Sequence, residues 1–287
     1  MNKPTLGYRI FSGFNIVFFI LVSATMLLPF INVITLSLEP AHIASETGVL
    51  HLFPREITFD AYIEIWRQGQ VPVSLMNSVF ITVVGASLGV LVTGMLAYGL
   101  SNEKVMGVKL VSMLVLFTMM FHGGIIPSYM LVKNLGLIDS LWSLIIPSLI
   151  TGYNVILMRV FFKGLPESLS ESAMLDGCTE VGIFFRIVLP LSAPIIATVT
   201  LFYAVMKWNS FFQAIMFITD PKKKPLQVIL REILTAATSG DAKDMSLDLG
   251  MNLKMATAVV AMAPILSVYP FLQKHFTKGI LLGAVKG

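Results

Sequence analysis

The chain has 287 residues, of which 56% are hydrophobic and 13% are charged, and its formal net charge is +4. Its charged share is about half of the ~25% usual in soluble domains, and its mean hydropathy is +0.83. Such a hydrophobic composition excludes a disordered chain. It also excludes a nucleic-acid-binding domain and an ordinary soluble enzyme, because a soluble fold of this size cannot bury so much apolar surface. The single cysteine, Cys178, excludes a disulfide framework and a cysteine-based metal site.

Six apolar stretches are long enough to cross about 30 Å of hydrocarbon as helices, which takes ~20 residues. None alternates strictly between apolar and polar residues, so a lipid-facing barrel is not expected, and helices must satisfy the backbone in lipid. The expected spans are residues 11–38, 75–100, 110–132, 137–162, 188–218 and 255–271. The sequence therefore predicts an all-α membrane protein in which residues 1–287 form one domain.

The first and third spans carry features of their own. Lys3 and Arg9 precede the first apolar run, as in a signal peptide, but the run is longer than a 7–15-residue signal core. We therefore expect an uncleaved first span. In the third span, His122-Gly123-Gly124 and Pro127 predict a bend or a break.

An even number of spans places both termini on one side of the membrane. The short segments on the side of the termini carry basic residues more densely than the longer loops on the other side. Since short cytoplasmic loops are enriched in Lys and Arg, we expect both termini in the cytosol and the chain in a cytoplasmic membrane.

Two connections on the predicted outer side are long. Within residues 39–74, the i, i+3, i+4, i+7 spacing of Phe59, Tyr62, Ile63 and Trp66 predicts a short interfacial helix capped by Thr58 or Asp60. That helix either seals the bundle or contacts an external partner. The polar connection 220–254 contains a stretch rich in small residues at 235–243, which indicates a flexible loop, and residues 226–234 predict a helix or a hairpin.

The connection 163–187 lies on the predicted cytosolic side. Pro166 suits the first turn of a helix, Glu167 suits its positive end, and Gly177 suits its stop. A second short helix is expected from Thr179 to Ile187. These features alone leave a docking site and an inert loop as alternatives.

The sequence ESAMLDGCTEVGIFFRIVLP, residues 171–190, resembles the EAA motif of bacterial ABC-importer permeases. The matching residues are Glu171, Ala173, Gly177, Ile187, Leu189 and Pro190. Ser172 and Cys178 depart from the motif but are small, as the usual residues are. The stretches LMRVFFKGLPESLSESA and KHFTKGILLGAVKG resemble the carbohydrate-uptake, maltose-type branch. The stretches FHGGIIPSYMLVKNLGLIDSLW and KPLQVILREIL are most similar to permeases for complex or pectic oligosaccharides.

This resemblance implies a type I ABC importer permease fold with six spans and a cytosolic coupling helix. Such a permease pairs with a second permease, binds two cytosolic ATPases, and receives sugar from an extracytoplasmic solute-binding protein. ATPase closure then rocks the spans, so that the cavity opens alternately inward and outward. The chain has no G-x-x-x-x-G-K-[ST] phosphate loop, so we expect ATP and Mg on the partner ATPase, no cofactor on this chain, and no enzyme activity of its own.

The resemblance also assigns roles within the coupling loop 163–187. Glu171 is the polar anchor, Ala173 gives close packing, and Gly177 makes the turn, with Ser172 and Asp176 in the same contact segment. Ile187, Leu189 and Pro190 tie the loop to the fifth span.

Polar and aromatic side chains within the spans are candidates to line a sugar path, since sugar sites combine such groups. They are Lys207, Trp208, Asn209, Gln213, Tyr153, Asn154 and His122. A lysine inside a span costs ~2.5–3.5 kcal/mol, so we hypothesise that Lys207 meets an anionic sugar such as a uronate. The alternatives are snorkelling or pairing with a carboxylate of the partner permease for Lys207, and interhelical hydrogen bonds for the others.

Two other classes remain alternatives at this point. A secondary transporter or channel usually carries intramembrane carboxylates for ion coupling, whereas every Asp and Glu of this chain lies in a loop or at the end of an expected span. A membrane-embedded enzyme would need a motif such as H-E-x-x-H or G-x-S-x-G, and neither is present. No metal site is expected.

Overall fold

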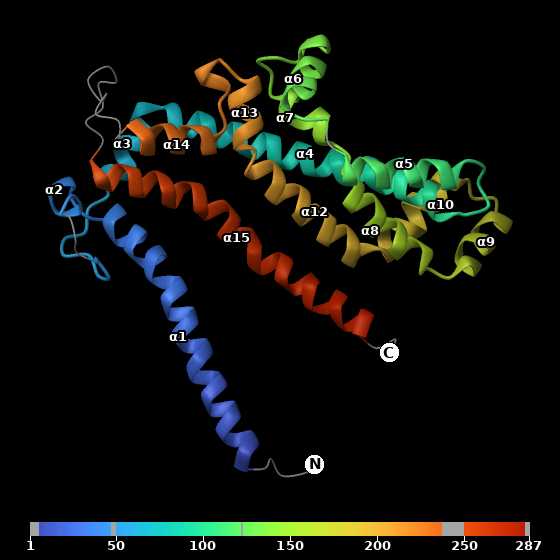
Figure 1. The fold of residues 1–287 in the computed structure, drawn as a ribbon, viewed down its shortest axis with the longest axis horizontal. Helices are drawn as coiled ribbons and strands as arrows, with labels where there is room; N and C mark the ends of the chain where they lie inside the picture. The colour runs from blue at the N-terminus through green and yellow to red at the C-terminus, as the bar shows by residue number, and fades with distance from the viewer. Residues whose placement is uncertain (1–5, 47–49, 122, 237–249, 285–287) are drawn as a thin grey trace. The chain divides into compact units, whose positions relative to one another are not determined.

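The computed structural model describes residues 6–46, 50–121, 123–236 and 250–284 (Figure 1). Over these ranges every regular element is helical, which confirms the predicted class. The chain divides into two compact units: Met1–Val71 with Leu230–Ala263, and Pro72–Ile229 with Pro264–Gly287. Each unit is described by itself, and the single permease domain stays a prediction.

The first unit contains α1 (Leu6–Ser37), α2 (Ala41–Ala44) and α3 (Asp60–Gln68). The hydroxyls of Ser37 and Tyr62 lie 2.8 Å apart and join the end of α1 to α3. In the connection, His51 Nδ1 lies 2.7 Å from Glu39 Oε2, and both side chains are buried. These polar contacts hold α3 against the end of α1 and hold His51 against Glu39, which follows α1.

The predicted helix of the 39–74 connection is present as α3, but its four apolar residues do not share one environment. Tyr62 turns inward to Ser37, whereas Phe59, Ile63 and Trp66 are exposed. The other inward residues, Ala61 and Ile65, are buried. The predicted cap at Thr58 or Asp60 is wrong, because the N-cap of α3 is Phe59, which makes no side-chain capping hydrogen bond. The Thr58 hydroxyl instead accepts the Asp60 amide at 3.1 Å in a local turn before the helix.

The second unit is organised along α4 (Gln70–Ser101) and α12 (Ala193–Trp208). The other helices of residues 102–229 are α5 (Val108–Met120), α6 (Ile125–Asn134), α7 (Trp142–Ile145), α8 (Gly152–Lys163), α9 (Glu167–Leu175), α10 (Glu180–Ile183), α11 (Leu189–Leu191) and α13 (Phe211–Phe217). Single turns of other helix types are η1 (Ile146–Ser148), the π-helical η2 (Phe184–Val188) and η3 (Pro221–Lys223). Like α4, two further helices run through the unit boundaries: α14 (Leu226–Ala236), which resolves the helix-or-hairpin alternative, and α15 (Met251–Ala284).

The long apolar segments of the described residues are not all straight helices. Two unbroken helices, Ile10–Ser37 and Gln70–Ser101, are long and apolar enough to cross a membrane. Three further pairs qualify only as bent spans: α5 with α6 at 120°, α7–η1 with α8 at 51°, and α10–α11 with α12 at 86°. The predicted break in the third span therefore occurs between Met120 and Ile125.

The fourth and fifth expected spans differ from the continuous helices that their hydropathy indicated. The fourth changes from α7 to the 3-10 turn η1 at Pro147, whose missing N–H and ring disrupt the preceding helical turn, and it then breaks between Ser148 and Gly152. The fifth ends at Trp208 and continues as the separate α13, while Pro194 lies in the first turn of α12, where proline is tolerated.

Candidate functional site

Within the loop 163–187, the carboxyl end of α9 is fixed by two backbone hydrogen bonds. The Cys178 N–H donates to Ala173 O at 2.9 Å, and the Gly177 N–H donates to Met174 O at 3.0 Å. This pair of bonds is the Schellman motif, and it requires a left-handed residue, here Gly177 with φ of +81°. The helix stop predicted at Gly177 is present, although α9 itself begins after Pro166 rather than with it.

The two faces of α9 differ in their surroundings. Ala173 is 7% exposed and packs into a cluster with Phe162 of α8 and Phe184 of η2. The partly buried Cys178, Ile187 and Leu189 pack against the same cluster. The close packing of Ala173 is therefore with residues of this chain. Pro190, predicted to tie the loop to the fifth span, is exposed.

The opposite face and the tip of α9 are open. Leu175 is 91% exposed, and Glu171, Ser172 and Asp176 are exposed beside it. Glu171 forms no ion pair or hydrogen bond with another residue that the structure describes. A large apolar side chain without cover, flanked by free polar groups, is the composition of a contact surface rather than of a sealed loop.

A cavity of about 960 Å³ lies between α9, α10 and the end of α4. Its lining includes apolar side chains such as Phe162, Phe184 and Val188, and its charged lining residues are Glu103, Lys104, Lys163, Glu167, Glu171 and Glu180. The lining therefore carries an excess of negative charge.

Polar contacts tie this cavity's walls together. The Tyr98 hydroxyl of α4 donates to Glu180 Oε2 at 2.8 Å, and Lys163 at the end of α8 pairs with Glu103. The hydrogen bond from the Lys163 ammonium, together with its charge, holds the pKa of the Glu103 carboxyl below its ordinary value. The loop 163–187 is thus attached to α4 and the residues that follow it by side chains whose charges lie at the surface.

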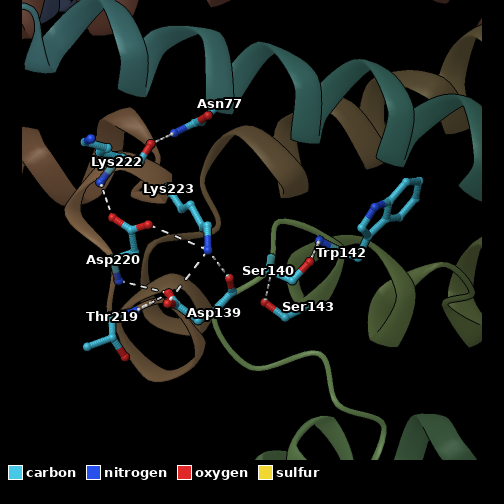
Figure 2. A network of polar contacts seen from close by, with 9 residues as sticks. All are labelled: Asn77, Asp139, Ser140, Trp142, Ser143, Thr219, Asp220, Lys222 and Lys223. Atoms are coloured by element: carbon cyan, nitrogen blue, oxygen red, sulfur yellow. Dashed lines mark hydrogen bonds and ion pairs between the residues drawn. The ribbon is translucent and has the colours of Figure 1, made fainter.

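A second polar region lies toward the other end of α4 and joins the α6–α7 connection to the segment after α13 (Figure 2). Asp139 has φ of +60°, and its Oδ1 accepts the backbone N–H groups of Thr219 and Asp220 at 2.9 Å each. The Lys223 ammonium donates to Asp139 O at 2.9 Å and lies 3.8 Å from Asp139 Oδ2 and 3.6 Å from Asp220 Oδ2. The two backbone hydrogen bonds, and then the Lys223 charge, lower the pKa of Asp139.

Hydrogen bonds join this region, which we call the Asp139–Lys223 network, to side chains of α4. The Asn77 amide donates to Lys222 O at 2.8 Å, and Ser78 Oγ accepts the Leu226 N–H at 2.8 Å. Asn77 and Tyr98 are 21 residues apart on α4, which is about 30 Å at 1.5 Å per residue. The network and the loop 163–187 are therefore separated by about the thickness of the hydrocarbon core.

Sequence reasoning missed the Asp139–Lys223 network. The one local signal was Asp220-Pro221, because an aspartate before a proline typically starts a turn, and Asp220 Oδ1 does accept the Lys222 N–H at 2.9 Å. Its pairing with Asp139 brings together residues about 80 positions apart, which no local pattern indicates.

The predicted sugar-path residues are dispersed in this conformation. Trp208 and Asn154 are buried, whereas Asn209, Gln213 and Tyr153 are exposed, and His122 lies outside the described residues. None of them lines the 960 Å³ cavity. The ring of Tyr153 lies 6.0 Å from that of Phe202 on α12, and the Asn209 amide donates to Val205 O of its own helix.

Lys207 is 2% exposed, and its ammonium is enclosed. It donates to Leu144 O at 2.8 Å, to Ile145 O at 3.0 Å and to Ser148 Oγ at 2.6 Å. Each of its three hydrogens therefore has an acceptor within the chain. Among the described residues, no group of three or more His, Cys, Asp or Glu side chains is placed to hold a metal ion.

Comparison with known proteins places this architecture among transport permeases. The family model described as "Binding-protein-dependent transport system inner membrane component" matches residues 8–281. The polygalacturonan/rhamnogalacturonan transport system permease protein YtcP of Bacillus subtilis (strain 168) is 44% identical, over 97% of this chain and 99% of its own. Protein LplC of the same organism is 45% identical, over 100% of this chain and 98% of its own.

A solved structure shares the fold over nearly the whole chain. It is the crystal structure of a bacterial ABC transporter involved in the import of the acidic polysaccharide alginate. The matched chain is 28% identical, with a TM-score of 0.87, and the match covers 96% of this chain and 100% of that one. The fold is thus that of a type I ABC importer permease. The chain belongs to the family of inner membrane components of binding-protein-dependent transport systems.

Proposed function

We propose that this chain is one of two permease subunits of an ATP-driven oligosaccharide importer, and that α9 is the helix through which partner ATPases drive it. The observation that carries this proposal is the asymmetry of α9. Its Ala173 side is fixed in the core of the chain, whereas its tip presents Leu175 and Asp176 to the solvent. Because one side of α9 is packed into the chain and its tip is exposed, a force applied at the tip is transmitted to the rest of the chain and does not detach the helix.

The proposed topology has six spans with both termini in the cytosol. Two spans are the unbroken helices α1 and α4, three are the bent pairs, and the sixth is α15, whose described apolar part is Met251–Ser267. The separation of about 30 Å along α4 supports a cytosolic coupling loop and an external Asp139–Lys223 network. The network then belongs to the side on which a solute-binding protein would deliver sugar.

The proposed mechanism follows the packing behind α9. ATPase closure displaces α9, and the cluster that holds Ala173 transmits this displacement to α12, because Val199 and Tyr203 of α12 belong to the same cluster. Packed cores transmit such shifts since they have little free volume. The spans then rock and expose the path to either side in turn. ATP and Mg bind the partner ATPases, and this chain contributes no catalytic residue.

We propose an oligosaccharide as the substrate, with acidic oligosaccharides as the first class to test. The names of two similar proteins, a polygalacturonan/rhamnogalacturonan permease and an alginate importer, support that class. The path residues that we propose are Trp208, Asn209, Gln213, Tyr153, Asn154 and His122, in a cavity shared with the second permease. A calorimetric screen of the cognate solute-binding protein with galacturonate oligosaccharides and neutral oligosaccharides tests the substrate class, and binding of neutral sugars alone would contradict it.

Docking through the tip of α9 can be tested with a matched pair of charge insertions. Leu175→Glu alters the tip, and Met106→Glu alters the α4–α5 connection, where Met106 is 97% exposed. We expect Leu175→Glu to lower recovery of the ATPase with the purified permease by at least tenfold, since a buried interface centre loses ~2 kcal/mol or more. Met106→Glu should behave as the wild type. Equal recovery in both variants, or equal loss, would contradict the assignment of the docking site to the α9 tip.

A further inference from the structure

We propose that Lys207 and Tyr203 are positioning residues that form an internal brace, which fixes the break between η1 and α8 on which the transport path is built. Both project from α12, four residues apart, and therefore from the same face of that helix. The brace is read from contacts within the second unit and does not depend on the proposed function. Its consequence for sugar transport does rest on that function.

The brace begins where α12 lies against α4. Gly85 and Gly89 leave room on α4 for the two side chains: a Cβ at Gly85 would lie 3.0 Å from Lys207 Cε, and one at Gly89 would lie 3.1 Å from the Tyr203 ring. Small residues at i, i+4 let membrane helices approach closely. Here they let two large side chains pass between the helices and reach the broken span beyond.

The Lys207 ammonium satisfies the backbone before the break. Leu144 O and Ile145 O belong to the last turns of α7–η1, and Lys207 bonds both, together with Ser148 Oγ, whose hydroxyl also lies 3.4 Å from Leu144 O. A cation at the carboxyl end of a helical segment is also favoured by the backbone dipoles.

The Tyr203 hydroxyl satisfies the backbone after the break. It accepts the Thr151 N–H at 3.2 Å and lies 2.6 Å from the hydroxyl of Thr93, which is buried on α4. Thr151 immediately precedes α8, so this bond fixes the point at which α8 starts. Side chains of α12 thus bond the Leu144 and Ile145 carbonyls before the break and the Thr151 amide after it.

Both bonds matter because unpaired backbone at membrane depth is costly. Non-helical backbone is tolerated within a membrane only where protein or water satisfies it, and a buried lysine is tolerated only where it is fully bonded. Among the described residues no carboxylate pairs with Lys207, so its partners are these neutral acceptors. A sugar could engage the ammonium only by breaking them, which argues against the direct contact with an anionic sugar hypothesised from the sequence.

The brace is tested in the assembled importer with Lys207→Met and Tyr203→Phe, which keep the volume and remove the polar tip. The control is Lys133→Met, which removes an exposed lysine of α6. Hydrogen exchange of the peptide covering residues 149–154 should accelerate at least tenfold in the first two variants and stay unchanged in the control. Unchanged exchange in Lys207→Met would overturn the proposal.

Transport separates positioning from direct sugar contact. The probes are a galacturonate oligosaccharide and its methyl ester, which differ only in charge, supplied with the solute-binding protein. We expect Lys207→Met to reduce uptake of both probes by the same factor, and to increase the ATP hydrolysed per sugar imported at least threefold, a ratio that a smaller folded fraction does not change. A loss confined to the acidic probe, or an unchanged ratio, would overturn the proposal. The ATPase should be recovered with these variants as well as with the wild type. If the proposed function is wrong, the ATPase will not be recovered even with the wild-type permease.

Discussion

The two ends of α4 carry polar regions of opposite character. At the Asn77 end, Asp139 accepts two backbone amides and the Lys223 ammonium bonds a backbone carbonyl as well as two carboxylates, so that the network is satisfied from within. At the Tyr98 end, Glu171 has no partner among the described residues and Leu175 is 91% exposed. The polar groups of the first end are bonded to one another and join two loops, whereas the second end leaves polar and apolar groups uncovered, as the proposed docking site requires.

This difference indicates how the chain divides its tasks. A network of hydrogen bonds to charged groups resists deformation, because breaking one bond leaves its donor or acceptor without a partner, which costs free energy. The α9 helix, with Ala173 buried in the chain and Leu175 exposed, is instead the surface that we propose for ATPase docking. We therefore expect substitutions at the Asp139 end to change stability, and substitutions at the α9 end to change assembly and transport.

The largest effect is expected from Gly177→Val. A β-branched residue at φ of +81° is strained, so the α9 stop should be lost and its tip displaced. We expect transport and ATPase recovery to fall at least tenfold. Gly182→Ala in the same loop is the control, since a Cβ there meets only Thr179 Oγ1 at 3.4 Å. Wild-type transport by Gly177→Val would remove the mechanical role of the α9 stop.

The next effect concerns the Asp139 end. Asp139→Ala removes the acceptor of the Thr219 and Asp220 amides and the partner of Lys223, so the melting temperature of the purified complex should fall clearly while ATPase recovery stays normal. Asp139→Asn keeps an acceptor oxygen and should lie between the wild type and Asp139→Ala. If Asp139→Ala instead lost the ATPase without losing stability, the contrast between the two ends would be wrong.

A smaller effect is expected from acidification. Because the folded pKa of Asp139 is lowered, its contribution to stability is complete above the ordinary carboxyl pKa of 3.8 and is lost as the pH falls through the folded value. The wild type should therefore lose more stability below about pH 4 than Asp139→Asn does. Melting curves of both proteins between pH 6 and pH 3 measure this, and parallel curves would show that the carboxylate charge contributes nothing.

The smallest effect is expected from Lys104→Ala. Lys104 Nζ lies 3.7 Å from Glu167 Oε2, but both side chains are largely exposed, and exposed pairs of this kind contribute little. We expect the melting temperature to change by no more than about 2 °C. A larger shift would show that the coupling loop is fastened to α4 by charge rather than by the packing of Ala173.

The sequence predicted the helical class, the break near Gly123 and the α9 stop, because hydropathy, glycine and proline act locally. It did not predict the break between Ser148 and Gly152, since residues 137–162 are apolar enough on average to indicate one continuous span. It also identified Lys207 as exceptional without identifying its partners. Leu144, Ile145 and Ser148 are about 60 residues away in the chain, and their contribution includes backbone carbonyls, which carry no sequence signature.

The contrast between the two ends of α4 is tested most directly by photo-cross-linking in the assembled importer. A photoreactive residue is placed at position 175, at the tip of α9, or at position 219, in the Asp139–Lys223 network, and both positions are exposed. We predict a cross-link to the ATPase from position 175 and none from position 219. A cross-link to the ATPase from position 219, with none from position 175, would contradict the assignment of α9 as the coupling helix.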